Sequence, residues 1–77
     1  MEKIKDATIT NDLIRYRLIN EIKLSGLTYT EIAKRVGISI TMISQYKSTK
    51  KMPTLENFAR ICQVLNLDAN YILGLTD

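Results

Sequence analysis

The residues best suited to chemistry lie between Ile32 and Leu55, where short polar side chains accompany cations. This stretch holds five basic residues and no acid: Lys34, Arg35, Lys47, Lys50 and Lys51. A merely solvated face more often mixes acids with bases, so the one-sided charge favours an anionic partner. Among its polar side chains are Ser39, Thr41, Ser44 and Gln45. Such groups hydrogen-bond at close range to base edges and phosphates, so the pattern favours binding of double-stranded DNA.

Catalytic and metal chemistry lack the residues that they need. The 77 residues include no histidine and one cysteine, Cys62, which excludes a Cys/His zinc site and a disulfide within the chain. The sequence also has no paired-carboxylate cluster and no glycine-rich phosphate loop. We therefore expect no enzyme activity, no cofactor and no metal. Cys62 lies on an apolar helical face, which predicts a buried, reduced thiol.

Residues 28–48 have the pattern of two short helices joined by a turn. Thr28 and Glu31 form a capping-box pattern, and Gly37 suits the left-handed end of the first helix. Ser39 can cap a second helix over residues 39–48. The apolar positions that face inward are Ile32, Ala33, Val36, Ile38, Ile43 and Tyr46. This pattern predicts a helix-turn-helix. A helical hairpin with no nucleic-acid role would look the same, and only the polar outward face and the charge favour DNA.

The chain from Leu27 to Leu67 resembles the Cro and phage-repressor type of helix-turn-helix domain, which is lambda-repressor-like. The resemblance runs through Leu27-Thr-x-x-Glu-Ile-Ala-x-x-Val-Gly-Ile-Ser39, Ile43-Ser-Gln-Tyr-Lys47, Pro53-Thr-Leu-Glu56 and Leu65-Asn-Leu67. It implies an all-α fold, a compact bundle of five short helices. It also implies a bacterial or phage transcriptional regulator, most often a dimer on a palindromic operator. Two departures stand out: Tyr29 replaces a common Gln, and Lys47-Ser-Thr49 replaces a common Glu-Asn-Gly.

The resemblance implies that residues 39–48 form the recognition helix and enter the major groove. The expected base contacts are Ile40, Thr41, Ser44 and Gln45. Gln45 can bond adenine N6 and N7 in a bidentate pair, and Ile40 suits a thymine methyl, so we expect an A/T-leaning half-site. The expected phosphate contacts are Tyr29, Thr30, Ser39, Lys47, Ser48, Lys50 and Lys51. Tyr29, Thr30 and Ser39 lie at helix N-termini, which favour phosphate. Lys50 and Lys51 lie on the loop after the recognition helix, which would follow the DNA strand. A loop charged only for solubility is the competing interpretation of Lys50 and Lys51.

The remaining segments are expected to frame the motif. We expect residues 1–11 to form a flexible tail and residues 12–77 to form the DNA-binding domain. Lys3 and Lys5 could track a phosphate backbone, but Glu2 and Asp6 offset them, so we favour a solvated tail. A first helix over 12–24 is capped by Thr10 or Asn11 and buries Leu13, Ile14, Leu18, Ile19, Ile22 and Leu24, while Arg15 and Arg17 point away from the core. A fourth helix from Thr54 has a core stripe of Leu55, Phe58, Ala59, Cys62 and Leu65.

A short last helix over 69–73, capped by Asp68 and stopped by Gly74, carries more apolar side chains than it can bury internally. We favour contact with a second copy of the chain, through Tyr71, Ile72 and Leu75. Docking on the first helix and continuation into a longer protein remain alternatives.

The sequence thus predicts a transcriptional regulator, most simply a repressor, that works in the cytoplasm of a bacterial or phage-infected cell. It has no apolar run long enough to cross a membrane and no signal segment. The alternative is a protein-binding adaptor or antitoxin-like module that uses the C-terminal apolar surface.

Overall fold

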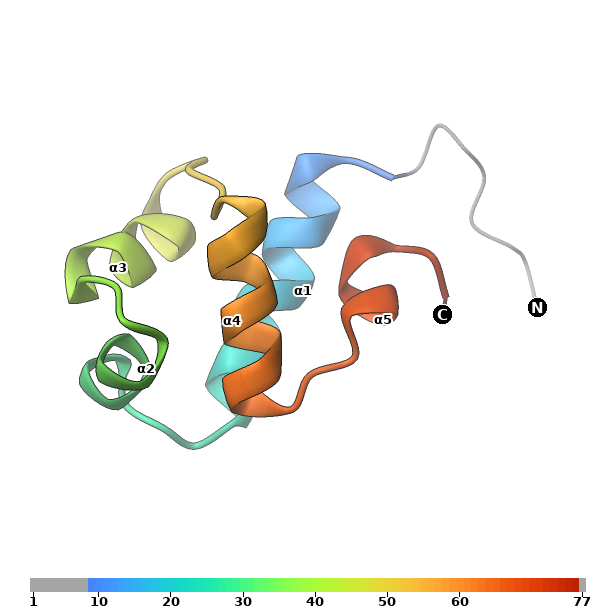
Figure 1. Cartoon of the computed structure of the whole chain (residues 1–77). Helices are drawn as coiled ribbons and strands as arrows, with labels where there is room; N and C mark the ends of the chain where they lie inside the picture. Colours follow the sequence, from blue (N-terminus) through green and yellow to red (C-terminus); the bar gives the residue numbers. More distant parts are fainter. Residues whose placement is uncertain (1–8, 77) are drawn as a thin grey trace.

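The computed structural model describes residues 9–76, which form five helices and no strand. The helices are α1 (Asn11–Leu24), α2 (Tyr29–Val36), α3 (Ile40–Ser48), α4 (Leu55–Leu65) and α5 (Ala69–Leu73), arranged as in Figure 1. The expected all-α bundle of five short helices is confirmed, and α1 begins one residue earlier than predicted. Lys3, Lys5 and the rest of segment 1–8 lie outside the described residues, as does Asp77.

Every helix begins at a polar side chain that accepts a hydrogen bond from a backbone N–H three residues later. These N-caps are Thr10, Thr28, Ser39, Thr54 and Asp68. The complete capping box at Thr28 and Glu31 is confirmed, and Thr10 rather than Asn11 caps α1. Helices of five to fourteen residues are marginal on their own, so these caps define where each helix begins.

Glycine is required at the turns that end α2 and α5. Gly37 ends α2 with φ of 85°, in the left-handed region where an L side chain is strained. Gly74 ends α5 with φ of 84° and is itself buried. A Cβ atom there would lie 3.3 Å from Ile9 Cγ1 and 3.4 Å from Leu13 Cδ2. Gly74 therefore lets the end of α5 lie close against the start of α1.

The core draws side chains from all five helices. Seven large side chains are almost completely inaccessible: Leu18, Ile22, Ile32, Ile43, Tyr46, Ile61 and Ile72. Helix α1 packs against α3 and α5, and α2 packs against α3 and α4. Ala33 and Val36 are buried as predicted, and so is the Cys62 thiol, whose pKa is raised by burial and by the nearby charge of Asp68. The two helices of the motif are thus held by a common core.

The predicted apolar stripes were wrong at four positions. Leu55 is 86% exposed and Ala59 is exposed, whereas Ile61, absent from the predicted stripe, is fully buried. The buried face of α4 is centred on Phe58, Ile61 and Cys62, and Ala59 is rotated about 100° from Phe58. Leu55 is the first residue of α4 and Leu24, 73% exposed, is the last of α1. Both side chains therefore lie at the end of a helix, where no neighbouring helix covers them.

Arg17 holds α5 against α1 and does not point away from the core as expected. Its guanidinium carbon lies 4.4 Å from the centre of the Tyr71 ring. The Nη1 group donates hydrogen bonds to the backbone carbonyl of Tyr71 and, over 3.3 Å, to that of Thr76. Together with burial of Ile72, these contacts dock α5 on its own chain. Ile72 is therefore unavailable to a second copy, which corrects its assignment as a dimer contact.

The phenol of Tyr46 provides a test of this core. Tyr46 is fully buried, and its hydroxyl has no hydrogen-bond partner in the described residues. Burial raises its pKa, and the Asn57 side chain, which lies near the hydroxyl without meeting hydrogen-bond geometry, offsets part of that rise. We predict that Tyr46→Phe raises the free energy of unfolding by about 1 kcal/mol, because an unpaired buried hydroxyl is removed.

Urea unfolding of both proteins measures this change, with Tyr46→Ala as the control for lost packing. That control should lower the free energy of unfolding by about 3–5 kcal/mol. A loss of stability in Tyr46→Phe would contradict the prediction and would show that the hydroxyl is paired, with Asn57 as the partner.

Candidate nucleic-acid interface

The outward face of α3 is defined by what its inner face buries. Ile43 and Tyr46 have no accessible surface, and successive helical residues are rotated by about 100°. Ile40, Thr41 and Ser44 are therefore exposed, with Ile40 at 47%. Gln45, the fourth predicted base contact, is half-buried at the edge of this face. The four residues lie on the first turns of one helix, and we call them the reading face.

The hydroxyl groups at the two ends of α3 have different hydrogen bonds. At the start, Ser39 Oγ accepts from the Met42 backbone N–H, so its own proton is free to be donated. At the end, Ser48 Oγ donates to the Ser44 carbonyl and Thr49 Oγ1 donates to the Gln45 carbonyl. The Ser48 proton is already used, which leaves Ser48 as a hydrogen-bond acceptor. Of the two predicted phosphate contacts, only Ser39 has a donor to offer as it stands.

The start of α2 carries the other predicted helix-end contacts. Thr30 is exposed and Tyr29 is half-buried against the core. The Glu31 carboxylate accepts hydrogen bonds from the Thr28 backbone N–H, over 3.0 Å, and from the Thr28 hydroxyl, over 3.1 Å. The backbone N–H groups of the first helical turn, including those of Tyr29 and Thr30, have no partner within a helix. An anion at the start of α2 would therefore bind these amides. The neighbouring Glu31 carboxylate is already hydrogen-bonded to Thr28.

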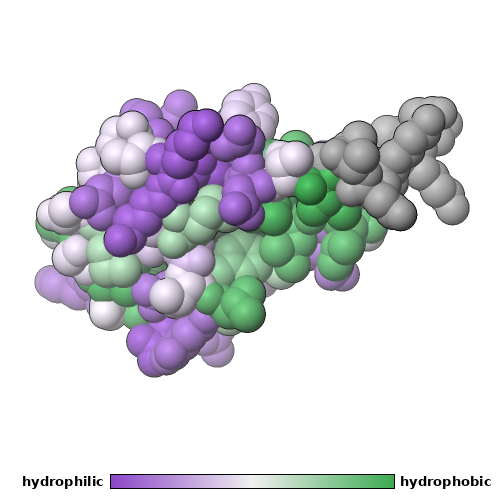
Figure 2. All heavy atoms as spheres, turned by 90° about the horizontal axis from the view of Figure 1, so that it is seen from above, coloured by the Kyte–Doolittle hydropathy of each residue, from purple (hydrophilic) through white to green (hydrophobic). Residues whose placement is uncertain are grey.

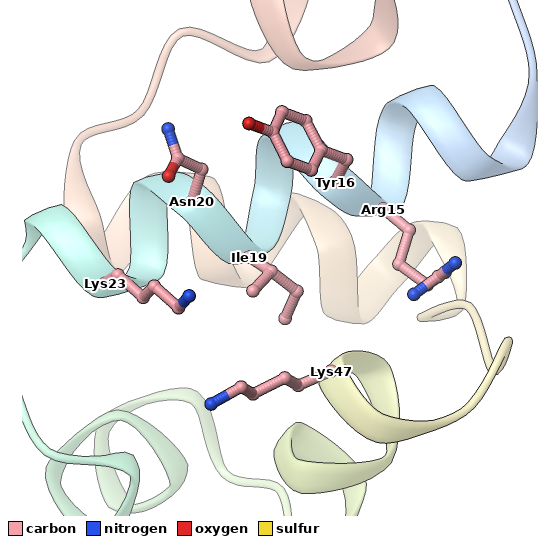
Figure 3. Close-up of a pocket in the computed structure, with 6 residues that line it drawn as sticks. All are labelled: Arg15, Tyr16, Ile19, Asn20, Lys23 and Lys47. Atoms are coloured by element: carbon pink, nitrogen blue, oxygen red, sulfur yellow. The ribbon is translucent and has the colours of Figure 1, made fainter.

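The predicted cations divide between two places. Lys50 and Lys51 are exposed on the loop between α3 and α4, and the Lys51 backbone N–H bonds Thr49 Oγ1 over 3.1 Å. Lys47 instead lies on the side of α3 that faces α1, and its side chain runs along the gap between the two helices (Figure 3). Figure 2 shows hydrophilic residues over much of the half of the molecule that holds α2 and α3, and hydrophobic residues toward the α5 end. The structure thus brings the reading face and most of the predicted cations to one half.

A hollow of about 190 Å³ lies between α1 and α3, and the sequence analysis did not find it. Its lining is Arg15, Tyr16, Ile19, Asn20, Lys23 and Lys47. Figure 3 shows Arg15, Ile19 and Lys23 on the side of α1 toward α3. Their spacing of four residues was the available signal, because residues at i, i+4 and i+8 share one helix face. Only the tertiary contact of α1 with α3 reveals that Lys47 joins them.

Within residues 9–76, no group of three or more His, Cys, Asp or Glu side chains could hold a metal ion. None of the five described helices is both long and apolar enough to span a membrane.

Comparison with known proteins identifies this arrangement. A family model described as Helix-turn-helix matches residues 18–72, which include the second half of α1, all of α2, α3 and α4, and all but the last residue of α5. The chain belongs to the helix-turn-helix family, of the Cro and phage-repressor type. The predicted resemblance is thereby confirmed. No solved structure matches the chain significantly.

Two curated relatives are similar over most of this chain. The cryptic phage CTXphi transcriptional repressor RstR of Vibrio cholerae is 33% identical over 61 residues, which are 79% of this chain and 54% of the relative. An uncharacterized HTH-type transcriptional regulator of Bacillus subtilis, YobD, is 31% identical over 55 residues, 71% of this chain and 49% of the relative. The chain therefore spans about half the length of the curated relatives it matches.

The capping box at α2 makes a prediction about pH. Hydrogen bonds from the Thr28 backbone and hydroxyl, with a smaller contribution from Arg35, hold the pKa of Glu31 below its ordinary value of 4.5. A depressed folded-state pKa stabilises the fold above the unfolded-state pKa, and this stabilisation disappears as pH falls through the folded-state value. We predict that Glu31→Gln is less stable than the unchanged protein at neutral pH and that the difference shrinks below the ordinary pKa.

Thermal unfolding of the two proteins between about pH 7 and pH 3 measures the difference. Glu56→Gln is the matched control, since Glu56 lies in the first turn of α4 and pairs with Arg60 without closing a capping box. A difference for Glu31→Gln that stays constant over this range would contradict the prediction.

Proposed function

We propose that this protein binds double-stranded DNA in a sequence-specific manner as a transcriptional regulator, a repressor of bacterial or phage origin acting in the cytoplasm. The observation that carries the proposal is the exposed polar reading face of α3, next to cations in an acid-free stretch of a helix-turn-helix fold. The relatives named as a transcriptional repressor and a transcriptional regulator support it. The protein acts by binding, and no catalytic step is part of the proposal.

In this proposal the start of α3 enters the major groove, where each base pair presents a distinct set of donors, acceptors and methyl groups. Gln45 and Ser44 hydrogen-bond base edges, and Thr41 contacts either a base edge or a methyl group. Ile40, which exposes almost half of its surface in water, packs against a thymine methyl. Lys50, Lys51 and Ser39 contact phosphates on either side and set the register of α3 on the duplex.

We further propose that two copies bind a palindromic operator. Each copy presents one reading face, and a two-fold symmetric pair reads two half-sites about one helical turn apart. Leu75, which is 63% exposed after α5, offers apolar surface for this contact. Tyr71 is half-buried with its ring beneath Arg17, so it contributes at its exposed edge.

A protein-binding adaptor is the second candidate, and a specific surface favours it. A hollow of about 210 Å³ opens beside α1 and α4, with a largely apolar lining of Asn11, Ile14, Met52, Pro53, Leu55, Phe58 and Leu73. With the exposed Leu55 at its edge, it resembles a surface that a partner chain would cover. An adaptor would bind its partner with weak dependence on salt and would not bind DNA.

Titration of random-sequence duplex DNA at several salt concentrations tests the proposed function directly. Binding should weaken as salt rises, with a log–log slope that corresponds to roughly four to eight phosphate contacts. Absence of binding at low salt would overturn the proposal and favour the adaptor.

Base reading and phosphate contact can be separated with two variants. A preferred duplex is first selected from a random pool with the unchanged protein. We predict that Gln45→Ala loses about 1–3 kcal/mol of preference for this duplex over random DNA. Lys50→Ala should weaken binding to both duplexes alike and reduce the salt slope by about 1. Titrations of both duplexes at two salt concentrations measure these effects.

Arg60→Gln is the control for lost charge, because Arg60 lies on α4 and pairs with Glu56. It should leave both affinities nearly unchanged. Equal losses on the two duplexes for Gln45→Ala would contradict its role in base reading.

The dimer proposal predicts that Leu75→Ser weakens self-association at least about tenfold, because burial of one leucine side chain is worth about 1.5–3 kcal/mol. Sedimentation equilibrium with and without the selected duplex measures the association. Leu24→Ser is the matched control, since Leu24 is 73% exposed at the far end of α1. If Leu24→Ser weakens the association and Leu75→Ser leaves it unchanged, the interface does not include Leu75.

A further inference from the structure

We propose that the hollow between α1 and α3 is a binding site for a phosphate group. This site lies outside the reading face and uses two α1 side chains, Arg15 and Lys23, that the proposed function leaves without a role. Two sources supply the same chemistry: the backbone of a bound duplex, or a free phosphorylated small molecule. The first source rests on the proposed function, whereas the second does not.

The first argument is the charge of the lining. Arg15, Lys23 and Lys47 contribute three cations from two helices, and the lining holds no acid. Among the described residues, the salt bridges are Arg15 with Asp12 and Arg60 with Glu56, so Lys23 and Lys47 have no acidic partner. Cations held together in a concave surface attract an anion more strongly than the same charges spread over a flat one.

The second argument is the unsatisfied donor on Arg15. One terminal nitrogen, Nη2, lies 3.2 Å from Asp12 Oδ1, and the arginine side chain is 21% exposed. Its Nε atom is buried and has no hydrogen-bond partner among the described residues. An unpaired buried N–H is unfavourable and is rare in folded proteins. Because this Nε is inaccessible to solvent, the Arg15 side chain must turn into the hollow before an acceptor there can pair with it. A phosphate oxygen is such an acceptor.

The third argument is geometry. Figure 3 shows the Lys47 side chain running along the gap between α3 and α1, with its ammonium group toward the end that holds Lys23. Arg15 lies at the other end, beyond Ile19, with its guanidinium directed away from Lys47. The volume of about 190 Å³ is ample for a phosphate group. A phosphate presents several oxygens in different directions, so the Lys23 and Lys47 ammonium groups can both donate to it, and Arg15 joins them once its guanidinium turns toward the hollow. A bound phosphate would then tie α3, through Lys47, to the helix that braces it.

Two charge-removing variants test the site, Lys23→Gln and Lys47→Gln. Both lysines are exposed, so neither change disturbs the core, and circular dichroism checks that the fold is kept. Arg60→Gln, on the exposed surface of α4 and outside both the lining and the acid-free stretch, is the control for lost charge. The first measurement is an NMR titration with inorganic phosphate at constant ionic strength, with chloride as the reference. The second is the salt dependence of duplex binding.

A free phosphate ligand predicts saturable shifts of the Lys47 and Arg15 signals with phosphate and not with chloride, lost in Lys23→Gln and Lys47→Gln. A duplex phosphate predicts that each of these variants reduces the salt slope by about 1 while Arg60→Gln does not. Either result supports the site. If the unchanged protein binds no duplex, the proposed function fails, and the phosphate titration alone decides the site. Shifts equal to those with chloride, together with unchanged salt slopes, would overturn it.

Discussion

The arrangement of this protein depends on burial of one face of α3. Helix α3 packs against α1 and α2, and Ile43 and Tyr46 on its inner face have no accessible surface. A nine-residue helix has little stability of its own, so this packing is what keeps α3 folded and sets its rotation about its axis. The rotation in turn decides that Thr41 and Ser44 face outward. Because the interaction is apolar and close-packed, it holds the reading face at a fixed angle without using any polar group that the face needs.

The caps and the core act on different aspects of the motif. Thr28 with Glu31, and Ser39 with the Met42 amide, specify where α2 and α3 begin. The core then specifies how the two helices cross, with the small Ala33 buried on the inner face of α2. Arg17 has a comparable role at the other end of the molecule, where it links α1 to Tyr71 of α5. The polar interactions thus define where helices begin and link α1 to α5, while the apolar contacts set the angle at which α2 and α3 cross.

The charge distribution follows from the same arrangement. Acids and bases pair on the exposed surfaces of α1 and α4, at Asp12 with Arg15 and at Glu56 with Arg60. The stretch from Ile32 to Leu55 has no acid, so its cations face solvent without partners from their own segment. Packing of α3 on α1 then brings Lys47 to the side of α1 that carries Arg15 and Lys23. A mildly basic chain therefore has concentrated positive charge beside its reading face.

The sequence by itself determined the features that arise from neighbours a few residues apart. The capping box at Thr28, the left-handed Gly37 and the inward spacing of Ile43 and Tyr46 are short-range patterns, and each was predicted correctly. Tertiary structure alone decided which of the apolar side chains near the helix ends are buried by a neighbouring helix. Leu55 lies beyond the reach of a neighbouring helix, whereas Ile72 is enclosed when Arg17 draws α5 onto α1. The hollow at Lys47 also needed the fold, because it combines residues more than twenty positions apart that only helix packing brings together.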